Sequence, residues 1–229
     1  MKFTARTFVL SSALAAVVGV AVDTRTLRFV ETDLVVNHLV NGVPTLTDQR
    51  GVVHVAQFYD PHLVNPWGLA TSTTSPFWVS DNGAGVSTLY ASGGTPLSLV
   101  VSIPAPGDPL GSGGTPTGAV FNTAAASQQA FKITGVSSTG APISAPALFL
   151  FATEDGTVVG WNPSVNPRGF DPAKSGTYGI IAIDRSMKPG AVYKGLTMAT
   201  NPSSGETLLY VTNFHVRHVR KLRRSRWCR

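Results

Sequence analysis

Polar side chains able to bind a metal recur directly after three strand-like segments. They are Asp81 with Asn82, Glu154 with Asp155, and Asn213 with His215. Carboxylate and amide oxygens are ligands for divalent cations, and a set rich in oxygen suits Ca²⁺. If the three segments converge, these residues could hold a cation that assists a hydrolase or lyase reaction. The alternative, which these residue types favour, is that each set closes a turn by bonding to its own backbone.

A second candidate group lies before the first of these segments. Asp60, Asn65 and Trp67 could line one face of the domain and contact a ligand. The favoured interpretation is instead that Asn65 starts a turn before Pro66 and that Trp67 belongs to the core. Two further tryptophans, Trp78 and Trp161, fall inside strand-like segments, where packing is favoured over stacking on a sugar.

Familiar catalytic motifs are absent from the sequence. There is no Gly-x-Ser-x-Gly nucleophile elbow, no P-loop, no His-Glu-x-x-His and no Cys-x-x-Cys. Gly83-x-Gly85 lacks a third glycine and opens no helix, so it is not a dinucleotide fingerprint. No catalytic residue is therefore assigned, and the sequence favours binding over catalysis.

The elements that would position these residues form a repeat. Each copy has a glycine at a short apolar strand, a loop, and then an aromatic or β-branched strand that ends in polar turn residues. The copies begin at Asn65-Pro-Trp-Gly, Thr115-Pro-Thr-Gly and Val192-Tyr-Lys-Gly. Fourth strands are expected over Leu97 to Ile103 in the first copy and over Tyr178 to Ile183 in the second.

Four short antiparallel strands per unit are typical of a propeller blade, so we expect an all-β fold and a β-propeller. Nearly continuous apolar runs, such as Leu148 to Phe151, suit strands packed between neighbouring blades. The repeated glycine would let backbones approach near the axis. A β-sandwich is the rival architecture, but its strands would alternate more cleanly. Fewer than four blades fit in the chain, so a single chain is not expected to close a ring.

The two ends of the chain differ from its body. Residues 1–21 have the layout of a signal peptide, with Lys2 and Arg6 before an uncharged apolar stretch from Thr7 to Val22. We therefore expect export to the cell envelope or beyond, and no membrane span once the signal is removed. Residues 22–34 are read as a linker, and 35–215 as a partial propeller domain with a closing strand near Val36 to Val40.

The basic character of the chain is a property of its last fourteen residues. They hold seven of the 18 Lys and Arg and the single cysteine, Cys228. Without them and the signal, nine basic residues face twelve acidic ones, so nucleic acid is not an expected partner. Because the change falls inside the third repeat, we interpret 216–229 as an aberrant, out-of-frame tail of a truncated protein. A genuine basic tail that binds anionic surfaces is the alternative.

These motifs resemble an uncharacterised family of secreted bacterial proteins related to NHL-type β-propellers, some with a C-terminal PEP-CTERM sorting tail. The similarity covers residues 35–215. It rests on Asp60-Pro-His-Leu-Val-Asn-Pro-Trp-Gly-Leu-Ala70, Phe77-Trp-Val-Ser-Asp-Asn-Gly83, Phe151-Ala-Thr-Glu-Asp-Gly-Thr157, Gly160-Trp-Asn-Pro163, Tyr193-Lys-Gly-Leu196 and Asn213-Phe-His215. The resemblance implies export and a propeller, six-bladed in full-length relatives, and it carries over neither an activity nor a catalytic residue.

Two functions follow as expectations. The first is a binding or scaffolding module that recognises a protein or a glycan on one face. The second is a metal-dependent, lactonase-like hydrolase or lyase that uses the carboxylates at the strand ends. Sugar-lactone hydrolases with six blades hold a metal in that way.

Overall fold

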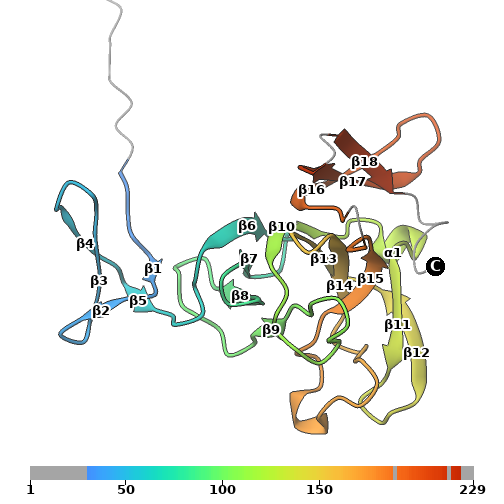
Figure 1. Cartoon of the computed structure of the whole chain (residues 1–229), viewed down its shortest axis with the longest axis horizontal. Helices are drawn as coiled ribbons and strands as arrows, with labels where there is room; N and C mark the ends of the chain where they lie inside the picture. The colour runs from blue at the N-terminus through green and yellow to red at the C-terminus, as the bar shows by residue number, and fades with distance from the viewer. Residues whose placement is uncertain (1–29, 188–189, 216–217, 223–229) are drawn as a thin grey trace, which may run out of the picture. The chain divides into compact units, whose positions relative to one another are not determined.

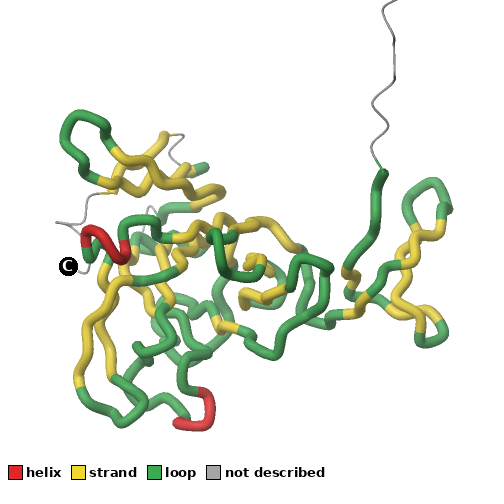
Figure 2. Tube along the Cα trace, turned by 180° about the vertical axis from the view of Figure 1, so that it is seen from behind, coloured by secondary structure: helices red, strands yellow, loops and turns green. Residues whose placement is uncertain are grey.

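In the computed structural model, nearly all regular secondary structure of the described residues is β-strand, mostly antiparallel and connected by turns and loops (Figures 1 and 2). The structure describes residues 30–187, 190–215 and 218–222. The described residues from Thr32 onward form one compact unit. Helix is limited to α1 (Ala125–Gln128) and a 3₁₀ turn at Pro172–Lys174. Within the described residues, no helix has the length and apolar character needed to cross a membrane. The expected all-β fold is confirmed.

Three antiparallel sheets follow one another along the chain. The first sheet contains β6 (Pro66–Ala70), β7 (Phe77–Asp81), β8 (Val86–Tyr90) and β9 (Val101–Ser102). The second sheet contains β10 (Pro116–Phe121), β13 (Phe149–Thr153), β14 (Thr157–Trp161) and β15 (Ile180–Asp184). The third sheet contains β16 (Tyr193–Thr200), β17 (Thr207–Asn213) and β18 (His218–Leu222). The four strands expected in each of the first two repeats are therefore present.

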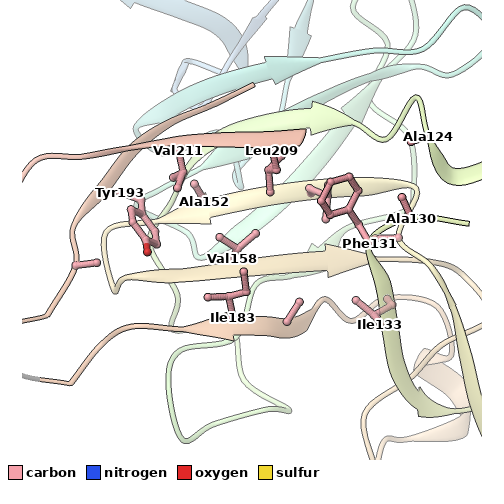
Figure 3. Packing of buried hydrophobic residues seen from close by; sticks show 14 of the residues in the cluster. Ala124, Ala130, Phe131, Ile133, Ala152, Val158, Ile183, Tyr193, Leu209 and Val211 are labelled. Atoms are coloured by element: carbon pink, nitrogen blue, oxygen red, sulfur yellow. The ribbon is translucent and has the colours of Figure 1, made fainter. Parts of the chain in front are cut away.

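The second sheet is buried on both faces. Successive residues of β13 point to opposite sides of the sheet, and each side packs against a different neighbouring sheet. Phe149 and Phe151 pack with Trp78 of the first sheet. Leu150 and Ala152 belong to a second core, which Leu209 of the third sheet completes. Figure 3 shows this second core. The prediction that the apolar runs are strands covered on both sides is thus confirmed, and it explains why they do not alternate with polar residues.

The long insertion in the second repeat contributes to this core. It forms α1 and a hairpin of β11 (Lys132–Val136) and β12 (Pro142–Pro146). Phe131 and Ile133 from this insertion are buried in the same cluster as Leu150. The hairpin therefore covers an outer part of the second sheet.

The strand predicted over Val36 to Val40 is divided in two. β1 (Val35–Val36) pairs in parallel with β5 (Phe58–Tyr59). β2 (Leu39–Val40) pairs with β3 (Val43–Thr47), which in turn pairs with β4 (Val53–Val55). The turn at Asn41 and Gly42, both at positive φ, forms a local hairpin. The segment therefore does not add to any of the three larger sheets.

The third sheet also differs from its expectation. The sequence pattern predicts that the repeat ends at His215. In the structure, β18 pairs with β17 along five residues, with Asn213 opposite His218 at one end and Leu209 opposite Leu222 at the other. Backbone pairing requires no alternation of side chains, and cationic residues are common on edge strands. The signal peptide predicted over residues 1–21 and residues 223–229 lie outside the described residues, so export and the reading-frame interpretation of the tail stay predictions.

Candidate functional site

The first strands of the three sheets lie side by side and begin at the same end. β10 contacts both β6 and β16. Each of the three strands has a register shift at its start, next to the repeated glycine. Gly68 and Gly118 permit the first strands to lie this close together. A Cβ on Gly68 would lie within 3 Å of the backbone of β10, and one on Gly118 within 3 Å of the backbone of β16. The prediction that the repeated glycine serves close backbone approach is therefore confirmed for Gly68 and Gly118.

A chain of polar contacts joins the three sheets at this end. Asn65 Nδ2 donates to Asn82 Oδ1 at 3.1 Å, and Asn82 Nδ2 donates to Glu154 Oε2 at 2.9 Å. Glu154 Oε1 accepts from Lys194 Nζ in an ion pair. The ammonium of Lys194 also lies 4.9 Å from the ring centre of Trp67. Residues from all three repeats therefore form one continuous set, which we call the strand-start site.

Charge within the strand-start site is balanced. The hydrogen bond from Lys194 holds the pKa of Glu154 below its ordinary value, with further help from the Asn82 amide and against partial burial. Glu154 therefore stays ionised and paired with Lys194 at neutral pH. Trp67 keeps 48% of its surface exposed, and Phe214, 5.9 Å from the same ammonium, is exposed as well. The site thus offers aromatic surface and amide groups with little net charge.

Asp81 lies in a different environment, buried within the first sheet. Its Oδ2 accepts from the Thr88 amide at 3.1 Å and from the Thr88 hydroxyl at 2.7 Å. Its Oδ1 is buried without a hydrogen-bond partner among the described residues. Burial raises the pKa of Asp81 to about 7, an effect that the Thr88 hydrogen bonds oppose and the Asp60 charge reinforces.

Asp60 is also buried and serves to hold the loop before the first sheet. Its Oδ2 accepts from the Tyr90 hydroxyl at 2.9 Å, and its Oδ1 accepts from the His62 amide at 2.8 Å. Burial raises the pKa of Tyr90 above its ordinary value, and the hydrogen bond to Asp60 adds to this effect. Asp60 therefore fixes structure beneath the first sheet and does not reach the strand-start site.

We expect the Asp81→Asn substitution to remove a pH dependence of stability. Because the folded state raises the pKa of Asp81 from 3.8 to about 7, the associated stability is complete below pH 3.8 and declines as the pH rises toward 7. The decline is at most about 1.4 kcal/mol per pH unit. Asparagine keeps an acceptor for Thr88 and cannot ionise. Urea unfolding should therefore show the variant about 2 kcal/mol more stable than wild type at pH 7.5 and nearly equal to it at pH 4.

A matched control is Asp184→Asn, which changes an exposed carboxylate at the end of β15. It should leave the difference between the two pH values as in wild type. A wild-type protein whose stability rises steadily from pH 4 to pH 7.5, with Asp81→Asn following the same curve, would contradict the raised pKa.

The other predicted metal ligands bond to protein donors. Asp155 Oδ2 accepts from the amide and the hydroxyl of Thr115 at 2.7 and 2.9 Å. Asn213 Oδ1 accepts from the amides of Val192 and His215 at 3.1 and 3.2 Å. Across residues 30–187, 190–215 and 218–222, no three His, Cys, Asp or Glu residues are grouped to hold a metal. The cation site, with Ca²⁺ as its ion, stays a prediction. Only the contact of Asn213 with the His215 amide closes a local turn, whereas Asp155 bonds to a residue 40 positions away in the chain.

Strand register explains why the carboxylates do not converge. In the first sheet Asp81 pairs with Pro66, and in the second Thr153 pairs with Pro116. Asp81 therefore corresponds to Thr153, and Asn82 corresponds to Glu154. The sequence motifs suggested an alignment one residue away from this, and one residue along a strand turns a side chain to the opposite face.

Of the nine candidate residues, the structure brings Asn65, Trp67, Asn82 and Glu154 together. Trp67 is exposed, so its assignment to the core is wrong, whereas Trp78 and Trp161 are buried between sheets as predicted. Lys194 was missed. It directly precedes the third repeated glycine, as Trp67 precedes the first, so the repeat itself contained the signal.

Comparison with known proteins adds no assignment to these features. No protein-family model matches the chain, and no curated protein is significantly similar to it.

Proposed function

We propose that the chain is part of an exported β-propeller and that it acts as a binding module for a neutral glycan at the strand-start site. Three sheets whose first strands lie side by side support the propeller. The signal-like layout of residues 1–21 supports export. The observation that carries the binding role is the polar chain from Asn65 to Lys194, which ends beside exposed Trp67.

The chemistry of the strand-start site suits a sugar. An exposed indole offers a flat apolar surface to the C–H face of a pyranose ring. The exposed amide of Asn65 carries donors and an acceptor, which match hydroxyl groups, whereas the Asn82 amide is buried and bonds to Asn65 and Glu154. Because Glu154 and Lys194 neutralise each other, the site has no unpaired charge to select an ionic ligand. A neutral glycan therefore fits this arrangement better than a phosphorylated or strongly charged partner.

A metal-dependent hydrolase or lyase has less support from this geometry. Such a reaction needs carboxylates free to ligate an ion. Here Glu154 is paired with Lys194, Asp155 with Thr115, and Asp81 with Thr88. No observation on the described residues favours that function over binding.

The Trp67→Ala substitution should abolish glycan binding while leaving the fold intact. Loss of a stacking platform typically removes most of the affinity of a shallow sugar site, and we expect at least a tenfold weaker interaction. Affinity electrophoresis in gels containing neutral polysaccharides would measure it, with far-UV circular dichroism to confirm folding.

Tyr59→Ala is the matched control, because Tyr59 is another exposed aromatic residue and lies outside the strand-start site. It should be retarded by the polysaccharide as strongly as wild type. Equal retardation of Trp67→Ala and wild type would refute the assigned site, and no retardation of wild type by any neutral polysaccharide would refute the glycan.

A further inference from the structure

The outer face of the first sheet is exposed where its counterparts in the other sheets are covered. Strand pairing shows that Leu69, Ala119 and Leu196 occupy the same position in the first strands of the three sheets. Their partners on the second strands are Val79, Phe151 and Val211. Ala119 packs into the core between the first and second sheets, and Leu196 into the core between the second and third. Leu69 is instead 64% exposed. The second and third sheets each pack this face against the preceding sheet. In the first sheet the same face has no sheet packed against it.

A groove of about 590 Å³ lies over this face. Trp67, Leu69 and Phe77 line it from the first sheet, and residues 32–35 line its other side. Val79 and Tyr90 are already buried, whereas Leu69 and Phe77 remain accessible. The open part of the groove therefore lies along β6.

The opposite end of the three-sheet series has a complementary feature. A Cβ on Gly68 would lie 2.7 Å from the amide nitrogen of Ala119, and one on Gly118 would lie 2.5 Å from that of Leu196. Each glycine thus makes room for the backbone of the corresponding residue, Ala119 or Leu196, in the first strand of the following sheet. Gly195 is the third of these glycines, and within the described residues a Cβ there would meet only Thr212 Oγ1, at 3.2 Å. Among the described residues, no strand backbone approaches Gly195 as the next first strand approaches Gly68 and Gly118.

We propose that a second copy of this chain packs against both the first and the third sheet, so that β16 of each copy lies against β6 of the other. Leu69 of one copy then lies beside Gly195 of its partner, as Ala119 lies beside Gly68 within the chain. Two such contacts related by a two-fold axis join three sheets from each copy into a closed ring of six. The contact repeats an interface that the chain already uses twice.

Charge favours this pairing of unlike ends. Residues 32–100 contain four acidic residues, of which Asp60 and Asp81 are buried, and one basic residue, whereas residues 190–215 and 218–222 contain three basic residues and one acidic residue. The acidic first end of one copy therefore attracts the basic third end of another, and like ends repel. A different protein would need to reproduce both the sheet geometry and this charge, which a second copy supplies without further assumption.

Sedimentation of the purified chain tests the proposal. Wild type should sediment as a dimer at micromolar concentration, and its dissociation constant should rise with salt because the ends are oppositely charged. Leu69→Lys should raise that constant at least a hundredfold, since the lysine would be buried opposite Gly195. Val55→Lys, at an exposed apolar residue of β4 outside the groove, is the control and should remain dimeric. Unchanged thermal melts of dilute monomer would show that both variants fold.

A mixing experiment tests the two-fold arrangement. Leu69→Lys and Gly195→Val should each be monomeric alone, because each breaks both contacts of its own dimer. Mixed together, they retain one intact contact, between Leu69 of the second variant and Gly195 of the first, and should form heterodimers. A monomeric wild type, a dimer unaffected by Leu69→Lys, an open-ended polymer, or no association on mixing would overturn the proposal. The samples contain no polysaccharide, so none of these outcomes depends on glycan binding, although Trp67 borders both the groove and the strand-start site.

Discussion

Replacement of Gly118 by alanine should destabilise the fold by about 3 kcal/mol or more. The new Cβ would lie 2.5 Å from the Leu196 amide nitrogen and 2.8 Å from the Leu196 Cβ. Both contacts involve atoms fixed to the backbone of β16, so no flexible side chain can move away. The third sheet would have to separate from the second, which would open the core that Leu209 and Val211 complete. Urea unfolding at one fixed protein concentration would measure the loss.

Gly93→Ala provides the control, because an added Cβ there has no atom within 4 Å. Its unfolding free energy should remain within about 0.5 kcal/mol of wild type. Should Gly118→Ala prove as stable as Gly93→Ala, the first strands of the second and third sheets cannot approach as closely as the structure has them.

The sequence predicted the strands well because their signals are local. Turn residues after β7 and β13 marked the strand ends, and the glycines of the three repeats marked the first strands. The apolar run around Phe149 predicted a strand buried on both faces, since only such a strand can bury successive residues. Each of these inferences used physical requirements that act within a few residues.

The strand-start site was less predictable because it depends on register. Sequence similarity placed Asp81 in line with Glu154, whereas strand pairing places Asn82 there. This difference of one residue separates the Asp81 carboxylate, which is buried in the first sheet, from the Glu154 carboxylate, which pairs with Lys194. Lys194 itself lies 40 residues from Glu154 and 127 from Trp67 in the chain, and no local pattern brings these three together. Only the stacking of the sheets does so.

The tail shows a further limit of pattern reading. Residues 218–222 lack an alternating pattern, yet they pair with β17 because an edge strand needs backbone partners on one side only. The free edge of β17 supplies those partners. Composition therefore predicted the unusual charge of this segment and missed its conformation.

Trp78→Ala should destabilise the protein by about 3–5 kcal/mol, because the indole fills the core between the first and second sheets. Trp78 is 2% exposed, and its ring stacks on Phe149 with 4.3 Å between centroids and lies 4.6 Å from Trp161. Alanine would leave a cavity against three aromatic neighbours that belong to strands and cannot collapse inward. Thermal and urea unfolding would measure the change.

Trp78→Phe separates the loss of volume from the loss of the indole nitrogen. Trp78 Nε1 is buried without an acceptor among the described residues, so its removal carries no hydrogen-bond penalty and the cost should be near 1 kcal/mol. Trp67→Ala should show the opposite pattern, with stability kept and glycan binding lost, because Trp67 is half exposed. A Trp78→Ala variant that kept its stability and lost only binding would place the ligand between the sheets and move the site away from the strand starts.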